Sequence, residues 1–158
     1  MTTVSNTTRK KQDTYHTVLS LAALFEGEFS IDWIVDLGGL KASVILSEVE
    51  KAITGGVLSK TGPGLFHFKD QSLQKQLIQS YSVAERNTFY KSLIKLLLAE
   101  KEGGIQDLLT ISDYLMLTEN DMDGCRALIE AARYYREQYD YEKAIRFYKK
   151  GLKDLEGI

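Results

Sequence analysis

Apolar residues recur at helical spacing from Tyr15 almost to the end of the chain, and glycines interrupt the pattern. In the first third, the pattern predicts one helix that closes at Gly27 and a short one that stops at Gly38. It predicts a third helix over residues 42–54. Because no apolar period covers residues 1–13, we expect these residues to form a flexible polar tail.

A β-hairpin is predicted directly after the third helix. The sequence predicts two short strands, Val57–Lys60 and Leu65–Phe68, with a turn between them at Thr61–Gly64. This turn contains Pro63, the only proline of the chain, and proline with glycine suits a tight reversal. Three helices followed by a hairpin is the order of a winged helix, which we predict over residues 14–70.

The remainder of the chain, residues 71–158, is predicted to be a helical bundle. Several stretches carry apolar stripes at helical spacing, and Gly103–Gly104 separates two of them. The last two helices are separated by a tight break near Tyr139–Asp140. The fold class is therefore mainly α.

The last helix pair resembles a tetratricopeptide repeat. Its residues alternate between large, small and aromatic side chains at the spacing of that repeat. The matching positions are Leu128, Ala132, Tyr135, Ala144, Tyr148, Gly151 and Leu152. The two alanines would allow the helices to approach closely, and the two tyrosines would fill the angle between them. Tyr139 stands where the repeat commonly has glycine, which suggests a slightly different turn.

The order of the whole chain resembles the region that follows the nucleotide-binding module in STAND-class signal-transduction ATPases, such as maltose-activator-type regulators and ATPase-linked cyclases and kinases. Short segments that carry this resemblance are Leu21–Ser30, Leu37–Leu40, Glu48–Leu58, Phe66–Asp70 and Asp113–Leu115. The resemblance implies a winged helix that packs on an ATPase module and a tetratricopeptide part that binds protein. No ATPase module is present in the 158 residues, so we interpret the chain as a fragment, a split gene product or a stand-alone relic of that architecture.

Composition excludes several classes of protein. The chain is 44% hydrophobic and 27% charged, with a net charge of −2, so a disordered chain is not expected. Its single cysteine, Cys125, excludes a disulfide framework and the usual cysteine zinc sites. No apolar run approaches the roughly 20 residues that a membrane span needs, and we expect a cytoplasmic protein.

Motifs that would carry chemistry are weak, so we predict no enzyme, no cofactor and no metal site. Gly55–Thr61 imitates a phosphate loop but has Ser59 at the second glycine position. An EF-hand pattern runs from Glu119 to Glu130, but the expected helix from Asp123 conflicts with a calcium loop. His16 and His67, the two histidines, fit partly exposed structural positions, and Cys125 has no histidine near it in sequence.

Binding to DNA is the alternative function that the fold suggests. A recognition helix needs outward Arg, Lys, Asn or Gln side chains, whereas residues 42–54 offer Glu48 and Glu50 against Lys51. Basic residues elsewhere, such as Lys60 in the wing and Arg9–Lys11 in the tail, could reach a phosphate backbone. A transcriptional regulator that binds DNA through these parts therefore remains the second interpretation.

A row of side chains on the first helix of the repeat is the candidate binding site. The row consists of Arg126, Ile129, Arg133 and Arg136, whose spacing places them on one face. Three guanidinium groups around one apolar residue suit an acidic peptide or another carboxylate-bearing partner. The alternative is a solvated surface on which these arginines pair with Glu130, Glu137 and Glu142.

Together these observations predict a non-enzymatic interaction segment of a bacterial signalling or transcription regulator. Its partners would be a protein or peptide, with an ATPase module or a second copy of the chain as further candidates. One repeat alone cannot bury both of its faces, so Phe147, Leu152 and Leu155 are expected to leave apolar surface that self-association or a continuation would cover.

Overall fold

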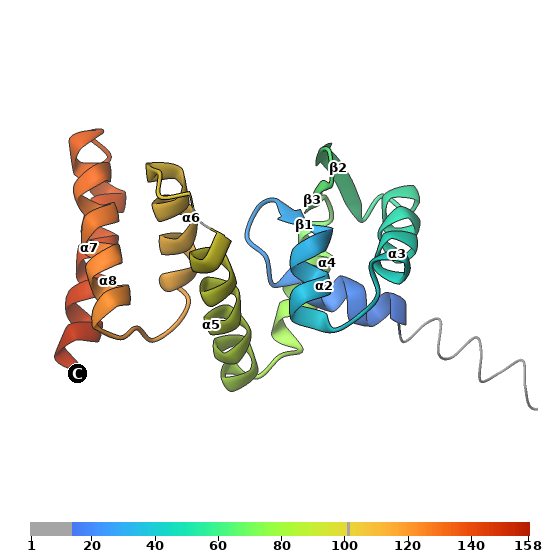
Figure 1. Ribbon diagram of the computed structural model, residues 1–158, viewed down its shortest axis with the longest axis horizontal. Coiled ribbons are helices and arrows are strands. Elements are labelled where there is room, and N and C mark those ends of the chain that lie inside the picture. Colours follow the sequence, from blue (N-terminus) through green and yellow to red (C-terminus); the bar gives the residue numbers. More distant parts are fainter. Residues whose placement is uncertain (1–13, 101) are drawn as a thin grey trace, which may run out of the picture. The chain divides into compact units, whose positions relative to one another are not determined.

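A computed structural model describes residues 14–100 and 102–158, and these residues are mainly helical with one small sheet (Figure 1). The chain divides into two compact units, one ending at Ser82 and the other beginning at Val83. Each unit has its own set of buried apolar side chains. We describe the two units separately.

The first unit contains the three predicted helices. A helix over residues 14–23 is followed by α2 (Ile31–Gly38) and α3 (Ala42–Thr54). The side chain of Ser30 accepts a hydrogen bond from the backbone N–H of Trp33, so it caps the start of α2. Gly39, with a φ of 65°, ends this helix in the left-handed conformation that glycine adopts at little cost.

The predicted hairpin is also present, with a third strand beside it. β2 (Leu58–Gly62) pairs with β3 (Leu65–Phe68) across a turn at residues 63–64. β1 (Phe29–Ser30), which the sequence pattern did not indicate, pairs with the other edge of β3. The sheet order is β1-β3-β2 and all pairs are antiparallel. This short strand connects the end of the first helix to the hairpin.

Aromatic side chains form the centre of the first unit. Phe25, Phe29 and Phe66 follow one another through ring contacts of 5.6 and 6.2 Å between centroids. Trp33 of α2 stacks on Phe25 at 5.7 Å. Phe25 and Phe29 are fully buried, so this cluster joins the first helix, the sheet and α2 into one core.

Helix α4 (Gln71–Gln79) belongs to the first unit, although the sequence suggested a boundary after Asp70. The side-chain amide of Gln74 donates hydrogen bonds to the backbone carbonyls of Ala23 and Phe25, both at 3.2 Å. The carbonyl of Ala23 is in the last turn of the first helix and that of Phe25 lies just beyond it, where no helical partner is available to either. The amide thereby fixes α4 against the first helix, and the boundary falls later, at Ser82.

The second unit consists of four helices, in which each packs against the next (Figure 1). They are α5 (Val83–Glu100), α6 (Ile105–Leu115), α7 (Met122–Glu137) and α8 (Tyr141–Glu156). Asp121 caps α7 and Asp140 caps α8, each by accepting a hydrogen bond from a backbone N–H of the first turn. The break that we predicted near Tyr139–Asp140 therefore separates two well-capped helices.

Tyr139, in the turn between α7 and α8, has a strained backbone conformation. Its φ is 62°, and among the described residues it is the single non-glycine residue with a positive φ. Its side chain is 78% exposed, so few contacts compensate for this conformation. A residue with a Cβ loses about 1–2 kcal/mol in the left-handed region, which glycine does not lose.

We therefore expect Tyr139→Gly to raise the stability of the second unit. The gain should be about 1 kcal/mol, because relief of backbone strain exceeds the extra entropy that glycine has in the unfolded chain. Urea denaturation followed by circular dichroism would measure it. Tyr139→Ala is the matched control, since it removes the ring and keeps the strain. Equal stability of the two variants would contradict the explanation.

Candidate partner-binding face

Small side chains allow α7 and α8 to lie in close contact. Ala131 and Ala132 of α7 are fully buried, and Ala144 and Gly151 of α8 are also buried. A Cβ atom built on Gly151 would lie 3.2 Å from Cγ1 of Ile129. The same atom would lie 3.4 Å from the backbone oxygen of Cys125. A larger residue at position 151 would therefore require Ile129 to shift.

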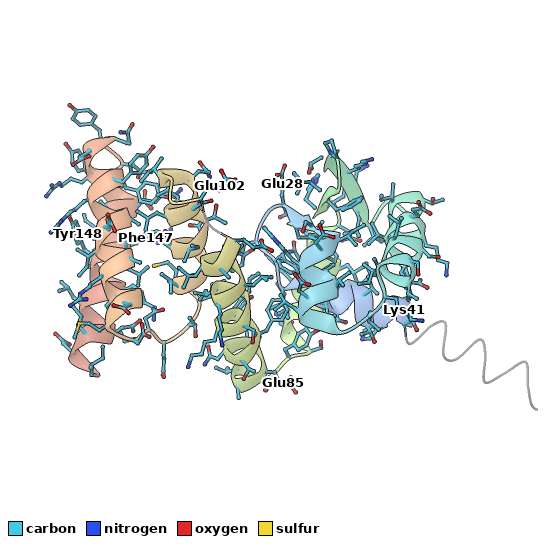
Figure 2. The ribbon with its side chains drawn as sticks, in the orientation of Figure 1. Glu28, Lys41, Glu85, Glu102, Phe147 and Tyr148 are labelled. Atoms are coloured by element: carbon cyan, nitrogen blue, oxygen red, sulfur yellow. The ribbon has the colours of Figure 1, made fainter. Side chains whose placement is uncertain are left out.

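An aromatic contact completes the packing, but it involves a different residue from the one we expected. The ring of Tyr135 lies 5.2 Å from that of Phe147, which is 3% exposed. Figure 2 shows Phe147 on the side of α8 that faces α6 and Tyr148 on the opposite side. Phe147 is thus buried by Tyr135, contrary to the prediction that it would lie exposed, whereas Leu152 is 55% exposed as predicted.

The end of the hairpin opposite the turn is held by Asn120. Its amide donates to the backbone oxygens of Leu115 and Thr118 at 2.8 and 3.1 Å. It also donates to the carboxylate of Asp154 at 2.7 Å. Asp154 in turn pairs with Lys150 of the same helix at 2.8 Å. One side chain therefore ties the segment before α7 to the last turns of α8.

Three groups near this hairpin have raised pKa values. Burial raises the pKa of the Cys125 thiol, and the nearby carboxylates of Asp154 and Asp121 add to the effect. Burial also raises the pKa of Tyr135, with a further contribution from the charge of Asp113. Asp113 itself has a raised pKa because of burial, which the positive charge of Lys143 partly offsets. All three shifts favour the protonated form of the group.

The predicted row of arginines lies on the outer face of α7. Arg126, Arg133 and Arg136 are all exposed. Arg126 approaches Asp123 at 3.5 Å, and both side chains of this pair are mostly in solvent. Ile129 is half-buried and turns toward Gly151 of α8, so it lies between the arginines and the second helix.

The arginines do not pair with the glutamates that the sequence offered as alternative partners. In the described part of the chain, Arg133 and Arg136 have no carboxylate within 4 Å. Glu130, Glu137 and Glu142 are exposed, and none of them forms an ion pair with these two guanidinium groups. Two guanidinium groups with ten N–H donors in all are therefore available to a ligand.

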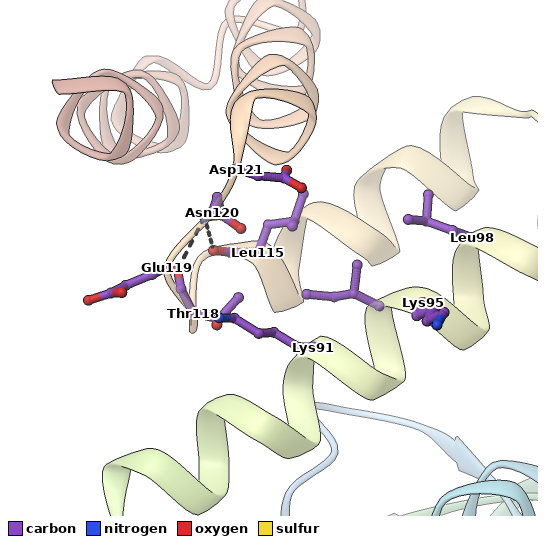
Figure 3. A pocket seen from close by; sticks show the side chains of 9 residues that line it. Lys91, Lys95, Leu98, Leu115, Thr118, Glu119, Asn120 and Asp121 are labelled. Atoms are coloured by element: carbon purple, nitrogen blue, oxygen red, sulfur yellow. Dashed lines mark hydrogen bonds between the residues drawn. The ribbon is translucent and has the colours of Figure 1, made fainter. Parts of the chain in front are cut away.

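Two shallow pockets lie elsewhere in the second unit. One, of about 550 Å³, lies between α5 and the segment that precedes α7 (Figure 3). Lys91 and Lys95 line it together with Thr118, whose buried hydroxyl has no hydrogen-bond partner among the described residues. The other, of about 610 Å³, adjoins Arg126 and is bordered by the carboxylates of Asp107, Asp123 and Glu130.

The EF-hand pattern is accounted for by the start of α7. Asp121 is the capping residue, and Asp123 and Glu130 are on the helix itself. Acidic residues in a first helical turn are favoured by the helix dipole. Across residues 14–100 and 102–158, no group of three or more His, Cys, Asp or Glu side chains is arranged to hold a metal ion.

The segment that resembles a phosphate loop and the two histidines are also explained by their places in the fold. Gly56, with a φ of 75°, leads into β2, which contains Ser59. Ser59 lies opposite His67 in the hairpin, and its hydroxyl is 3.0 Å from Nδ1 of that ring. This pairing, which sequence reasoning missed, bridges the two strands. His16 is exposed on the first helix.

The outward face of α3 is poor in positive charge. Its exposed side chains in the middle of the helix include Leu46, Ser47 and Glu50. Lys51, the basic residue of this helix, pairs with the buried carboxylate of Glu48 at 3.2 Å. Such a face has little to offer to a phosphate backbone. The basic tail residues Arg9–Lys11 lie outside the described residues.

Comparisons of the chain with protein-family models, curated proteins and solved structures gave no match. Among the described helices, none combines the length and the apolar character needed to cross a membrane.

The close approach at Gly151 predicts a strong effect of a larger side chain there. We expect Gly151→Leu to destabilise the α7–α8 hairpin by about 1–3 kcal/mol, because the new side chain has no space. Cys125 provides the measurement: its thiol is fully buried, so its alkylation rate follows opening of the hairpin. The rate should rise about tenfold or more.

Gly104→Leu is the control, since a Cβ there meets no atom within 4 Å. This variant should leave the alkylation rate of Cys125 close to that of the wild type. If Gly151→Leu and Gly104→Leu gave the same rate, the close packing at Gly151 would not limit the stability of the hairpin.

Proposed function

We propose that this chain is a non-enzymatic interaction segment of a signalling or transcription regulator, with a winged-helix unit followed by a tetratricopeptide-like helical unit. The partner is a protein or peptide that presents carboxylates to the outer face of α7. The observation that carries this proposal is the pair Arg133 and Arg136, exposed and without an acidic partner within 4 Å in the described chain. Guanidinium groups in this state favour bidentate contacts with carboxylates.

The first unit supports a role in contacts with protein rather than with DNA. Its three helices and hairpin have the order of a winged helix, and α3 would be the recognition helix. The exposed side of α3 combines Leu46, which is 43% exposed, with the carboxylate of Glu50. An apolar residue beside a carboxylate suits packing against another protein module, such as the ATPase module that the resemblance implies.

Charge reversal of the two arginines tests the proposal. A fluorescent polyglutamate peptide at low salt should bind the wild-type chain, and Arg133→Glu combined with Arg136→Glu should weaken binding about tenfold or more. Lys91→Glu combined with Lys95→Glu on α5 is the control, because this pair changes the net charge equally at two other exposed sites. Unchanged binding after reversal of both arginines would contradict the proposed site.

Binding to duplex DNA separates this proposal from the alternative. We expect an electrophoretic mobility-shift series to show weak binding without a steep dependence on salt. A DNA-binding regulator would instead show tight binding that falls sharply between about 50 and 200 mM salt, as phosphate contacts are lost. That result would favour DNA over protein as the partner.

A further inference from the structure

The α7–α8 hairpin also has an apolar stripe on α8, which is separate from the arginine row of α7. Its residues recur at alternating spacings of four and three, so they lie along one side of the helix. They are Tyr141, Ile145, Tyr148, Leu152 and Leu155. Tyr141, Ile145 and Leu152 are each more than half exposed, and the other two are half-buried.

The stripe lies on the side of α8 that is turned away from α6. On the opposite side, Lys143 lies over the ring of Tyr135 at 4.9 Å, and the charge of Asp113 of α6 reaches it. Phe147 projects toward that same side, whereas Tyr148 projects away from it (Figure 2). The stripe is therefore a free surface of the second unit, bordered on one edge by α7 and its half-buried Ile129.

Positive charge borders the stripe on both edges. On α7 the edge carries the three arginines of the predicted row, and on α8 the next row outward contains Arg146, Lys149 and Lys153, all exposed. Three acidic groups near these edges stand at the helix ends: Glu137, Glu142 and Glu156. On α7, Asp123 pairs with Arg126, and the exposed Glu130 lies on the outer side of the arginine row, away from α8. The middle of the face is thus apolar along its centre and basic on either side. This pattern is unusual in a chain whose net charge is −2.

We propose that this face binds an acidic amphipathic helix of a partner protein. An apolar stripe with four-three spacing accepts the matching stripe of another helix. The basic edges require glutamate or aspartate on both sides of that stripe in the middle of the partner helix. The stripe from Tyr141 to Leu155 is about 21 Å long, so the partner needs about four helical turns. The inference rests on the proposed function and specifies the partner.

A second copy of the chain fits this face poorly. Two copies joined through α8 would bring two apolar stripes together, but they would also bring together two sets of basic edges. Like charges opposite one another across an interface oppose association. An acidic helix satisfies both the apolar stripe and its edges.

The test uses two designed helical peptides of 16 residues with leucine at four-three spacing. One carries glutamate on both sides of the leucines, and the other carries lysine at the same positions. Fluorescence anisotropy with the full chain should show tighter binding of the glutamate peptide, and Ile145→Ser or Leu152→Ser should each weaken it about tenfold. Val83→Ser, at an apolar residue of α5 that is 65% exposed, is the matched control and should leave binding unchanged.

The outcomes distinguish this inference from the proposed function. If arginine reversal weakens binding of the glutamate peptide but both serine variants bind normally, the acidic site stands and the helix inference is wrong. If the lysine peptide binds equally well, or the glutamate peptide does not bind, the inference is also wrong. Concentration-dependent dimerisation that Leu152→Ser abolishes would overturn it in favour of a second copy. Failure of both the glutamate peptide and polyglutamate would reject the proposed function as well.

Discussion

The second unit depends on the backbone contact that Gly151 permits between α8 and α7. A Cβ atom at position 151 would lie 3.2 to 3.5 Å from atoms of Ile129, Cys125 and Leu128 of α7, so glycine lets the two helices approach more closely here than a larger residue would. In the same hairpin Phe147 lies inward against Tyr135, and Leu152 lies outside. The side of α8 that carries Gly151 is therefore the side packed on α7, and the apolar side that carries Leu152 is left uncovered. Burial of the other side supplies the stability that keeps this face in place.

Much of the fold could be predicted from periodicity, because helices with one buried face repeat their apolar residues every three or four positions. The two-residue strand β1 could not, since it exists only through its pairing with Phe66 and Leu65 far along the chain. The inclusion of α4 in the first compact unit could not be predicted either, for a similar reason. Gln74 has no apolar signal, and its hydrogen bonds reach carbonyls about fifty residues earlier, which no local pattern reveals.

The shared face of the arginines on α7 could be predicted from the sequence, but the side chains around them could not. Spacing alone placed Arg133 and Arg136 on one face of α7, because helical geometry fixes that relation. Whether they would pair with nearby glutamates depends on side-chain positions, which sequence distance does not determine. The choice between Phe147 and Tyr148 failed for a related reason: neighbouring residues differ by about 100° around a helix. A small error in the rotation of α8 exchanges the buried ring for the exposed one.

The α7–α8 hairpin is closed at both ends, by the strained turn at Tyr139 and by the bonds of Asn120 to Asp154 and to the segment before α7. A surface held in this way is preorganised: its helices lose little conformational freedom when a ligand arrives. The entropic cost of association then falls mainly on the ligand, which must become helical as it binds. Affinity would consequently be set by the intrinsic helicity of the partner, and selection among partners could act through helix propensity as much as through contacts.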